Sequence, residues 1–396
     1  MFIGHFTEQP WQDEKMMGRP FYRGAGVWAT QNWNPSNREY DPEIGRQLYN
    51  RYLDEKLYAE EMGFDGLMLN EHHSAPFCMQ SVTNVGAAIL ARQTKRAKIV
   101  ILGNLIANWE DPLWLAEQLA MIDMISHGRL VPGIVRGSGR ESIPHNQNPV
   151  YNRQWWQETH DFLIKTWTTP GPFRWEGNHL QYRYVNPWAL PLQKPHPPIW
   201  VPGIASMETV QWSARHHYPY IMLATQLDAT KQMFEAYHET AAEAGYKSGT
   251  QNVGYLFKVH VEETEELAEE AGRRYLNGVI NPFLAGNVAN ANTGQSPWID
   301  QPPGISSPDA RRRRFQLLGR ASAPSHGGAT QLPPTRRGYE EQVANYGIVS
   351  GTPKSVMPRI RHVLETLRPG SVFFWDGDGG MTHDDQMRSF KLMGDE

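Results

Sequence analysis

The chain has 396 residues, with 38 Lys or Arg against 42 Asp or Glu, so its formal net charge is −4. This near-balance argues against a dedicated nucleic-acid-binding protein, which carries a basic excess. The single cysteine, Cys78, excludes an intrachain disulfide and a Cys-rich zinc site. No apolar run approaches the roughly 20 residues of a membrane span, and the N-terminus lacks the features of a secretory signal. We therefore expect a cytoplasmic globular protein without a membrane or nucleic-acid partner.

Short apolar, β-branched runs alternate along the chain with longer segments whose apolar residues recur at helical spacing. The expected strands are Phe2–Phe6, Asp65–Asn70, Lys98–Ile106, Leu130–Arg136, Pro198–Pro202, Tyr220–Leu223, Val253–Val261 and Val372–Trp375. The expected helices are Pro42–Met62, Val82–Arg92, Pro112–Ile125, Arg153–Trp167, Ser206–His216, Ala229–Ala244, Glu265–Val279 and Thr352–Leu367. Asp41, Asp111 and Thr352 each precede a proline, the pattern of a capping residue before a first helical turn.

Eight strands that alternate with eight helices are the pattern of an α/β protein of the (β/α)8 TIM-barrel type; a doubly wound open sheet is the competing arrangement. Without an internal repeat or a linker, residues 1–396 are expected to form one barrel domain. Two stretches interrupt the alternation: Gln9–Tyr40 after the first strand, and Asn281–Tyr346 before the last helix. Insertions of this length are usually lids or disordered loops. Both are expected at the barrel mouth, where barrel active sites are built.

The segment Asn70-Glu71-His72-His73 closes the second expected strand. Successive side chains of a strand point to opposite sides, so only one of the two histidines can face the barrel mouth. Imidazole titrates near neutral pH, which suits it to proton transfer; a polar strand end with capping side chains is the alternative. No third ligand for a metal is visible nearby, so no metal site is expected.

Two further strand ends have the residue types that hold a phosphate. Arg136-Gly137-Ser138-Gly139 follows the fourth strand and offers a cation with exposed backbone N–H groups. Gly203 and Ser206 lie between the fifth strand and a helix, whose free N–H groups attract anions. The alternatives are a tight turn with a solvated arginine and a serine that only caps its helix.

Gly103-Asn104 interrupts an otherwise β-branched strand. Glycine in a central strand often marks a bulge or the close approach of a flat ligand. A packing accommodation in the narrow barrel interior explains the glycine equally well.

Phosphate-loop, zinc-helix and nucleophile-elbow motifs are absent, whereas an ordered series of short motifs resembles the bacterial-luciferase-like, flavin-dependent monooxygenase family. The series is AEEMGFD at residues 59–65, Glu71-His72-His73, Asp111-Pro112, Ala116-Glu117, DMISHGR at residues 123–129 and GIVRG at residues 133–137. The resemblance covers most of the chain outside the two insertions. It implies a (β/α)8 barrel that binds FMN at its C-terminal mouth, in a homodimer or homotetramer.

The resemblance also implies roles for single residues. Arg136 and Ser206 match the positions that contact the flavin phosphate in luciferases, and His72 matches their proposed catalytic histidine. It places a cis peptide under the flavin at Gly103–Asn104. Luciferases carry a cysteine where this chain has Val135, which we interpret as a change of pocket shape. The remaining residues expected at the flavin are Gly103, Asn104, Gly137, Ser138, Tyr151, Gly203 and Met207, and those expected in the substrate pocket are His5, Trp11, His73 and Phe77.

The activity that the resemblance implies is that of a two-component flavin monooxygenase. Reduced FMN from an NAD(P)H-dependent flavin reductase and dioxygen would together oxygenate a small, largely apolar organic substrate. The alternatives are a deazaflavin-dependent oxidoreductase that transfers hydride, with Arg311–Arg314 near the acidic tail of the deazaflavin, and a non-catalytic flavin-binding subunit of a heterodimer.

Overall fold

The computed structural model describes residues 1–13, 37, 40–73, 78–137, 139–142, 145–204, 206–223, 226–277, 339–378 and 380–395. Within this part of the chain, eight parallel strands follow one another in the order β4-β3-β2-β1-β11-β9-β8-β7. Their bounds are Phe2–Phe6 (β1), Gly66–Leu69 (β2), Lys98–Leu105 (β3), Leu130–Val135 (β4), Val201–Gly203 (β7), Tyr220–Leu223 (β8), Val253–Val261 (β9) and Ser371–Trp375 (β11). The expected TIM-barrel fold is confirmed.

The barrel is nearly closed between the two ends of this strand order. Gly133 of β4 forms an isolated parallel bridge with Trp200, just before β7. The Trp200 N–H donates to the Pro132 carbonyl at 3.1 Å, and the Ile134 N–H donates to the Trp200 carbonyl at 3.2 Å. β4 and β7 are therefore neighbours, which brings the segments that follow them to adjacent places on the barrel rim.

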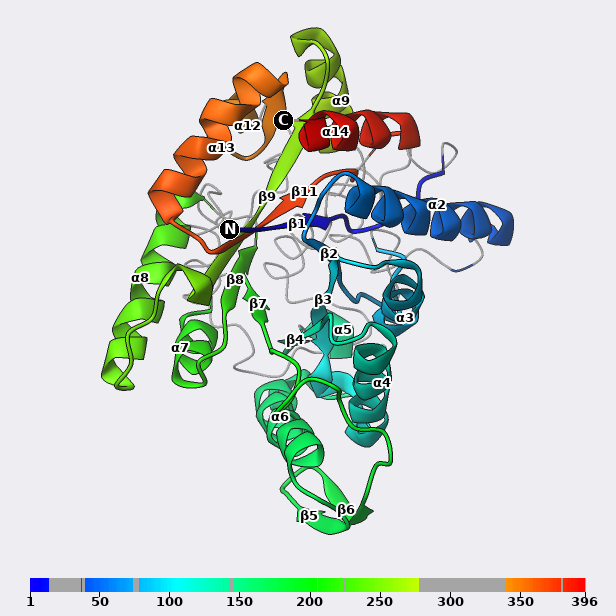
Figure 1. Ribbon diagram of the computed structural model, residues 1–396, viewed down its shortest axis with the longest axis vertical. Helices are drawn as coiled ribbons and strands as arrows, with labels where there is room; N and C mark the ends of the chain where they lie inside the picture. Colours follow the sequence, from blue (N-terminus) through cyan, green and yellow to red (C-terminus); the bar gives the residue numbers. More distant parts are fainter. Residues whose placement is uncertain are drawn as a thin grey trace, which may run out of the picture.

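Helices surround the strands, and the hairpin of β5 (Phe173–Glu176) and β6 (Gln181–Val185) projects beyond α6 (Figure 1). The longer helices are Pro42–Glu61 (α2), Thr83–Gln93 (α3), Pro112–Ile125 (α4), Asn152–Thr168 (α6), Met207–Arg215 (α7), Leu227–Glu243 (α8), Glu265–Asn277 (α9), Pro353–Leu367 (α13) and His383–Asp395 (α14). Short ones are Gly139–Ser142 (α5), Tyr339–Ala344 (α12) and the 3-10 turns Ile106–Asn108, Pro149–Tyr151 and Thr250–Asn252. No helix in these ranges is long and apolar enough to cross a membrane.

Two of the three expected helix caps form as expected. The Asp41 carboxylate accepts from the Glu43 N–H at 2.9 Å, and the Asp111 carboxylate accepts from the Leu113 N–H at 3.2 Å. The Thr352 side chain makes no capping bond; its hydroxyl donates to the Glu265 carboxylate at 2.6 Å and so ties α13 to α9.

Besides the short helices α5 and α12 and the 3-10 turns, four elements of the described chain were not expected from the sequence: the antiparallel hairpin Phe173–Glu176 (β5) and Gln181–Val185 (β6), the three-residue strand Val349–Gly351 (β10) beside β9, and α14. The expectation that Thr352–Leu367 is the last helix was therefore wrong. The buried face of α14 consists of Asp385, Gln386, Ser389 and Phe390. Only Phe390 of these four residues is apolar, so the apolar stripe of α14 is weak, although Met387 and Met393 also pack against the core.

The strands divide the core into an inner and an outer part. Phe6, Met68, Val100 and Trp375 belong to one cluster of buried side chains, whereas residues one position away on the same strands, such as Leu67 and Ile99, join the larger cluster that packs with the helices. This is the two-residue alternation of a strand. Phe6 lies in the inner cluster, so the preceding residue, His5, faces outward toward the helices.

Candidate active site

The C-terminal ends of the parallel strands lie on one rim of the barrel. Several of them are followed by ionisable side chains, among which Glu8 follows β1, the Glu71–His73 segment follows β2, Arg136 follows β4, and Asp378 follows β11. Glu141 lies in the short helix α5, which also follows β4. The fold thus gathers residues from distant parts of the chain at one place.

His72 lies between two carboxylates. Its Nδ1 is 2.9 Å from Glu141 Oε1, and its Nε2 is 3.7 Å from Glu8 Oε2. The shorter contact favours the tautomer with its proton on Nδ1, so that the lone pair is on Nε2. The Glu141 carboxylate also accepts from the His73 N–H at 3.2 Å, and the Asn108 amide donates to the Glu141 carbonyl at 3.0 Å. Glu141 therefore orients the imidazole that the sequence analysis predicted to transfer protons.

His73 contacts a different carboxylate from His72. Its Nε2 is 3.0 Å from Glu71 Oε1, and its ring meets the His145 ring edge to face at 4.2 Å. Glu71 Oε2 accepts from the Asn104 amide at 3.1 Å. The Glu71 carboxylate thus links His73 to the irregular region of β3.

The irregularity at Gly103-Asn104 is present in the structure. The β3–β4 ladder shifts register between Ile101 and Asn104. The cis peptide lies at Leu102–Gly103, so the prediction of Gly103–Asn104 was wrong by one bond. A Cβ on Gly103 would lie 2.6 Å from the Gly133 carbonyl oxygen, so the two backbones approach too closely for a side chain. Asn104 Oδ1 is buried and has no hydrogen-bond partner within the described part of the chain.

The two expected phosphate-holding segments follow the neighbouring strands β4 and β7. Arg136 is half-buried, and Gly137 has a φ of +75°, in the left-handed region that favours glycine. Ser206 is the N-cap of α7, and its side chain makes no capping bond to the first turn. Arg153 of α6 pairs with Glu208 in that first turn at 2.5 Å. Arg153 therefore adds a second arginine close to this helix start.

The other expected site residues lie in varied surroundings. Trp11 is buried against Tyr40, with ring centroids 4.7 Å apart, and its indole N–H has no partner among the described residues. Tyr151 and Met207 are exposed at the starts of α6 and α7. Gly203 ends β7, where a Cβ would meet the Tyr220 hydroxyl. Ser138, Phe77 and Arg311–Arg314 lie outside the described residues.

Among the expected pocket residues that the structure describes, His5 is directed away from the mouth. It is fully buried outside the barrel, with its Nδ1 3.3 Å from Lys56 Nζ of α2 and its Nε2 3.3 Å from the Gln386 amide of α14. Burial lowers the pKa of His5. We therefore leave His5 out of the site.

Glu8, Glu141, Asp378 and Arg153 were missed by the sequence reasoning. Glu8 and Asp378 directly follow two expected strands, so the rule that identified His72 and Arg136 could have found them. Their pairing depends on β1 lying next to β11, with Phe6 opposite Trp375. That adjacency follows only once the barrel is assumed to close.

Comparison with known proteins identifies the class to which this fold and site belong. The model of the luciferase-like monooxygenase family matches residues 32–368, and the chain belongs to this family. It is thus a luciferase-like oxidoreductase, a class that comprises flavin-dependent monooxygenases and deazaflavin-dependent oxidoreductases.

Two curated relatives show where the similarity lies. The oxygenase component of a flavin-dependent trigonelline monooxygenase from Acinetobacter baylyi is 29% identical over 167 residues, which are 41% of this chain and 46% of that protein. An alkanal monooxygenase alpha chain from Photorhabdus luminescens is 26% identical over 227 residues, which are 57% of this chain and 62% of that protein. The matches therefore span about half to three-fifths of these relatives.

Solved structures support the fold over a larger part of the chain. A monooxygenase from Streptomyces bottropensis has a TM-score of 0.69 at 18% identity, covering 100% of this chain and 98% of its own. The oxygenating constituent of 3,6-diketocamphane monooxygenase from Pseudomonas putida, in complex with FMN, has a TM-score of 0.66 at 20% identity, covering 89% and 92%. An F420-dependent secondary alcohol dehydrogenase has a TM-score of 0.60 at 14% identity, covering 86% and 92%.

Proposed function

We propose that the protein is the oxygenase of a two-component monooxygenase, which uses reduced FMN and dioxygen to oxygenate a small, largely apolar organic molecule. The observation that carries the proposal is His72, held at the barrel rim by Glu141 with its Nε2 toward Glu8. An imidazole fixed in one tautomer beside a buried carboxyl is equipped to move a proton at the mouth of a flavin-binding barrel. The names of the monooxygenase relatives support the choice of flavin and reaction.

The residues present fit a flavin with its phosphate at the adjacent ends of β4 and β7. Arg136 supplies a cation at one end. The first turn of α7 supplies backbone N–H groups, and the side chain of the N-cap residue Ser206 does not bond to them. On the barrel's inner side, the close approach of Gly103 to Gly133 leaves no room for side chains. This glycine contact offers a backbone platform for a flat ring, and the unpartnered Asn104 Oδ1 offers a hydrogen-bond acceptor beside it.

Reduced flavin would supply the electrons that activate dioxygen. The protein's own part is to bind the phosphate through Arg136 and the α7 N-terminus, to exclude water, and to move a proton at His72 Nε2. We assign Gly137, Ser138, Tyr151, Gly203 and Met207 to the same cofactor region. The buried Trp11, together with His73 and Phe77, is assigned to the substrate side.

The proposal includes two partners. One is an NAD(P)H-dependent flavin reductase, because the relatives are described as an oxygenase component and an oxygenating constituent. The other is a second copy of the chain. Trp114, Met121 and Met124 of α4 are 64%, 52% and 41% exposed, and apolar side chains gathered on one helix are typical of an interface.

Anaerobic titration with reduced FMN and, in parallel, with a reduced deazaflavin tests the assignment. We expect reduced FMN to bind more tightly, and Arg136→Ala to weaken its binding by about tenfold to a hundredfold, the value of a hydrogen bond to a charged group. Arg46→Ala is the control, because the Arg46 side chain is 64% exposed on α2. Preference for the deazaflavin would favour a hydride-transferring oxidoreductase instead. Unchanged affinity in Arg136→Ala would place the phosphate elsewhere.

A further inference from the structure

We propose that a chain of three side-chain amides positions His73, the second histidine of the pair. The amides belong to Asn104, Asn84 and Gln118, and they act through the Glu71 carboxylate. Together they keep the His73 proton on Nε2 and leave the lone pair on Nδ1. The three residues are thus positioning residues rather than catalytic ones, and their role in turnover rests on the proposed function. The tautomer is a property of the folded chain and can be measured without flavin or substrate.

Each link of this amide chain is a hydrogen bond between side chains. His73 Nε2 is 3.0 Å from Glu71 Oε1, and the Asn104 amide donates to Glu71 Oε2 at 3.1 Å. The same Asn104 nitrogen donates to Asn84 Oδ1 at 3.0 Å. The Asn84 amide donates in turn to Gln118 Oε1 at 2.9 Å. The amide chain therefore runs from the barrel rim through β3 to α3 and α4, which carry Asn84 and Gln118.

The fold encloses the middle of the amide chain. The helix α3 packs against both β3 and α4 (Figure 1). Glu71, Asn104 and Asn84 are only 6%, 1% and 5% exposed. Water cannot replace a lost partner easily at such positions, and a buried polar group without a partner is costly. Each of these side chains therefore depends on its neighbours in the amide chain for its orientation.

The carboxylate determines which way the neighbouring groups must turn. An ionised carboxylate only accepts hydrogen bonds, so Asn104 has to turn its NH2 group to Glu71, and His73 has to offer an N–H at Nε2. Asn84 accepts from the second N–H of Asn104, and Gln118 keeps the Asn84 amide in that orientation. The Asn104 amide therefore cannot turn over without losing both bonds. The same orientation leaves Asn104 Oδ1 as the oxygen without a partner among the described residues.

The two neighbouring histidines then present different nitrogens. His72 carries its proton on Nδ1 toward Glu141, whereas His73 carries its proton on Nε2. Within the described part of the chain His73 Nδ1 makes no hydrogen bond, and the side chain is 15% exposed. A lone pair on this nitrogen can accept from a hydroxyl or N–H group of a bound molecule, which a protonated Nδ1 could not.

Nitrogen NMR of the resting protein with isotope-labelled histidine measures the tautomer directly. With the imidazole neutral, we expect the His73 signals, identified by their loss in His73→Gln, to show a protonated Nε2 and an unprotonated Nδ1. Asn104→Asp has the same size but no N–H group, so its carboxylate repels that of Glu71 and both His73 signals should shift toward the average of the two tautomers. A proton on His73 Nδ1 in the unmodified protein, or an unchanged spectrum in Asn104→Asp, overturns the proposal.

A second pair of variants leaves β3 unchanged. Asn84→Leu removes the acceptor for the second N–H of Asn104 and should also mix the two His73 tautomers. Asn84→Asp should restore the Nε2–H form, because a buried carboxylic acid accepts from Asn104 through one oxygen and donates to Gln118 through the other. If Asn84→Leu keeps the original His73 spectrum, or if Asn84→Asp alters it as much as Asn84→Leu does, the amide chain does not position His73.

The matched control is Gln193→Ala. Gln193 also donates its amide to a buried carboxylate, that of Asp123, at 2.7 Å. It donates to the Leu130 carbonyl as well, at the first residue of β4 and thus at the end of the barrel opposite the mouth. The His73 signals should be unchanged in Gln193→Ala. A change as large as that in Asn84→Leu would contradict a specific role of the amide chain.

Turnover gives a second readout. We expect kcat/KM to fall by about tenfold to a hundredfold in Asn84→Leu, the value of a hydrogen bond to a charged group, and to recover in Asn84→Asp. The affinity for reduced FMN should stay the same in both variants. An equal loss in both would contradict the role of the amide chain in turnover. A protein that shows the His73 tautomer but does not bind reduced FMN refutes the proposed function and leaves the positioning of His73 intact.

Discussion

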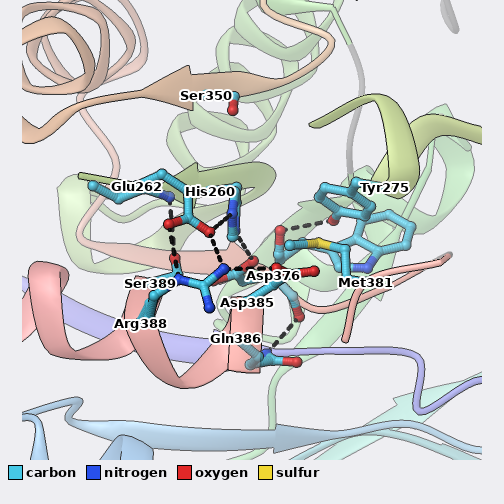
Figure 2. Close-up of polar contacts among 12 residues, drawn as sticks. His260, Glu262, Tyr275, Ser350, Asp376, Met381, Asp385, Gln386, Arg388 and Ser389 are labelled. Carbon is cyan, nitrogen blue, oxygen red and sulfur yellow. Dashed lines mark hydrogen bonds and ion pairs between the residues drawn. The ribbon is translucent and has the colours of Figure 1, made fainter. Parts of the chain in front are cut away.

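Raising the pH should weaken the buried ion network that holds β11 in place. His260 is fully buried, with its Nδ1 2.9 Å from Asp376 Oδ1 and its Nε2 3.2 Å from Glu262 Oε1. Glu262 in turn accepts two hydrogen bonds from Arg388 of α14, both at 3.1 Å. Figure 2 shows this chain of contacts between β9, the end of β11 and α14. Loss of the charge on His260 therefore removes an ion pair that joins three elements.

The magnitude follows from the pKa of His260. Burial alone would lower this pKa, but Asp376 and Glu262 raise it from 6.5 to about 9. At about 1.4 kcal/mol per pH unit this rise corresponds to about 3 kcal/mol of folding stability. Because the folded-state pKa lies above the unfolded one, this stability is fully present below about pH 6.5. It is lost as the pH rises through about 9.

Urea unfolding of the unmodified chain and of His260→Asn measures this contribution. The unfolding free energy of His260→Asn is subtracted from that of the unmodified chain at each pH. This removes the contribution of Lys56, whose pKa burial lowers to about 7, so that it makes stability rise over the same pH range. The difference in unfolding free energy between the two proteins should shrink by about 3 kcal/mol from about pH 6 to pH 10. His196→Asn is the control, since His196 has no carboxylate within ion-pair distance in the described ranges. A difference that stays constant with pH would refute the reasoning.

Two further substitutions test the site and its scaffold. In Gly133→Ala the new Cβ would lie 2.3 Å from the Ile101 carbonyl oxygen, so thermal unfolding should show a loss of stability of about 1–3 kcal/mol. The control Gly86→Ala in α3, where the nearest atom is the Gln80 side-chain oxygen at 3.1 Å, should change stability little. Equal losses in the two variants would contradict the close approach of β3 and β4. Glu141→Gln should lower turnover by about tenfold and leave the affinity for reduced FMN unchanged. The factor of ten corresponds to about one pKa unit of lost stabilisation of the His72 imidazolium. Full turnover in Glu141→Gln, measured beside His72→Ala as the reference for complete loss, would show that Glu141 does not orient the histidine.

The sequence predicted the barrel because its strands carry strong local signals. β3 and β9 are long β-branched or aromatic runs, and the helices between strands bury apolar faces. Of the elements that were not predicted, β10 and α14 have weaker signals, whereas the hairpin β5–β6 alternates aromatic and polar residues, a strand pattern that the sequence analysis overlooked. β10 has only three residues, and the buried positions of α14 are mainly polar because Gln386 contacts His5 and Ser389 accepts from the Val261 N–H.

The candidate site was predicted in part for a related reason. His72 and Arg136 stand at the ends of strands and belong to recognisable motifs. Glu141 lies 69 residues after His72 in the chain, and its contact with the imidazole depends on α5 lying beside the segment that follows β2. The cis peptide was predicted one bond away from its position. A sequence motif locates such a bond only to within a residue or two of a strand, whereas the backbone geometry determines which bond is cis.

The reaction of the reduced-FMN complex with oxygen tests the central claim most directly. The complex is formed without oxygen, mixed rapidly with air-saturated buffer, and followed through the return of the oxidised flavin absorbance. A monooxygenase that shields its flavin from water should return it slowly and in more than one phase, with His72→Ala altering the late phase. A single fast phase, equal to that of free reduced FMN, would contradict the account.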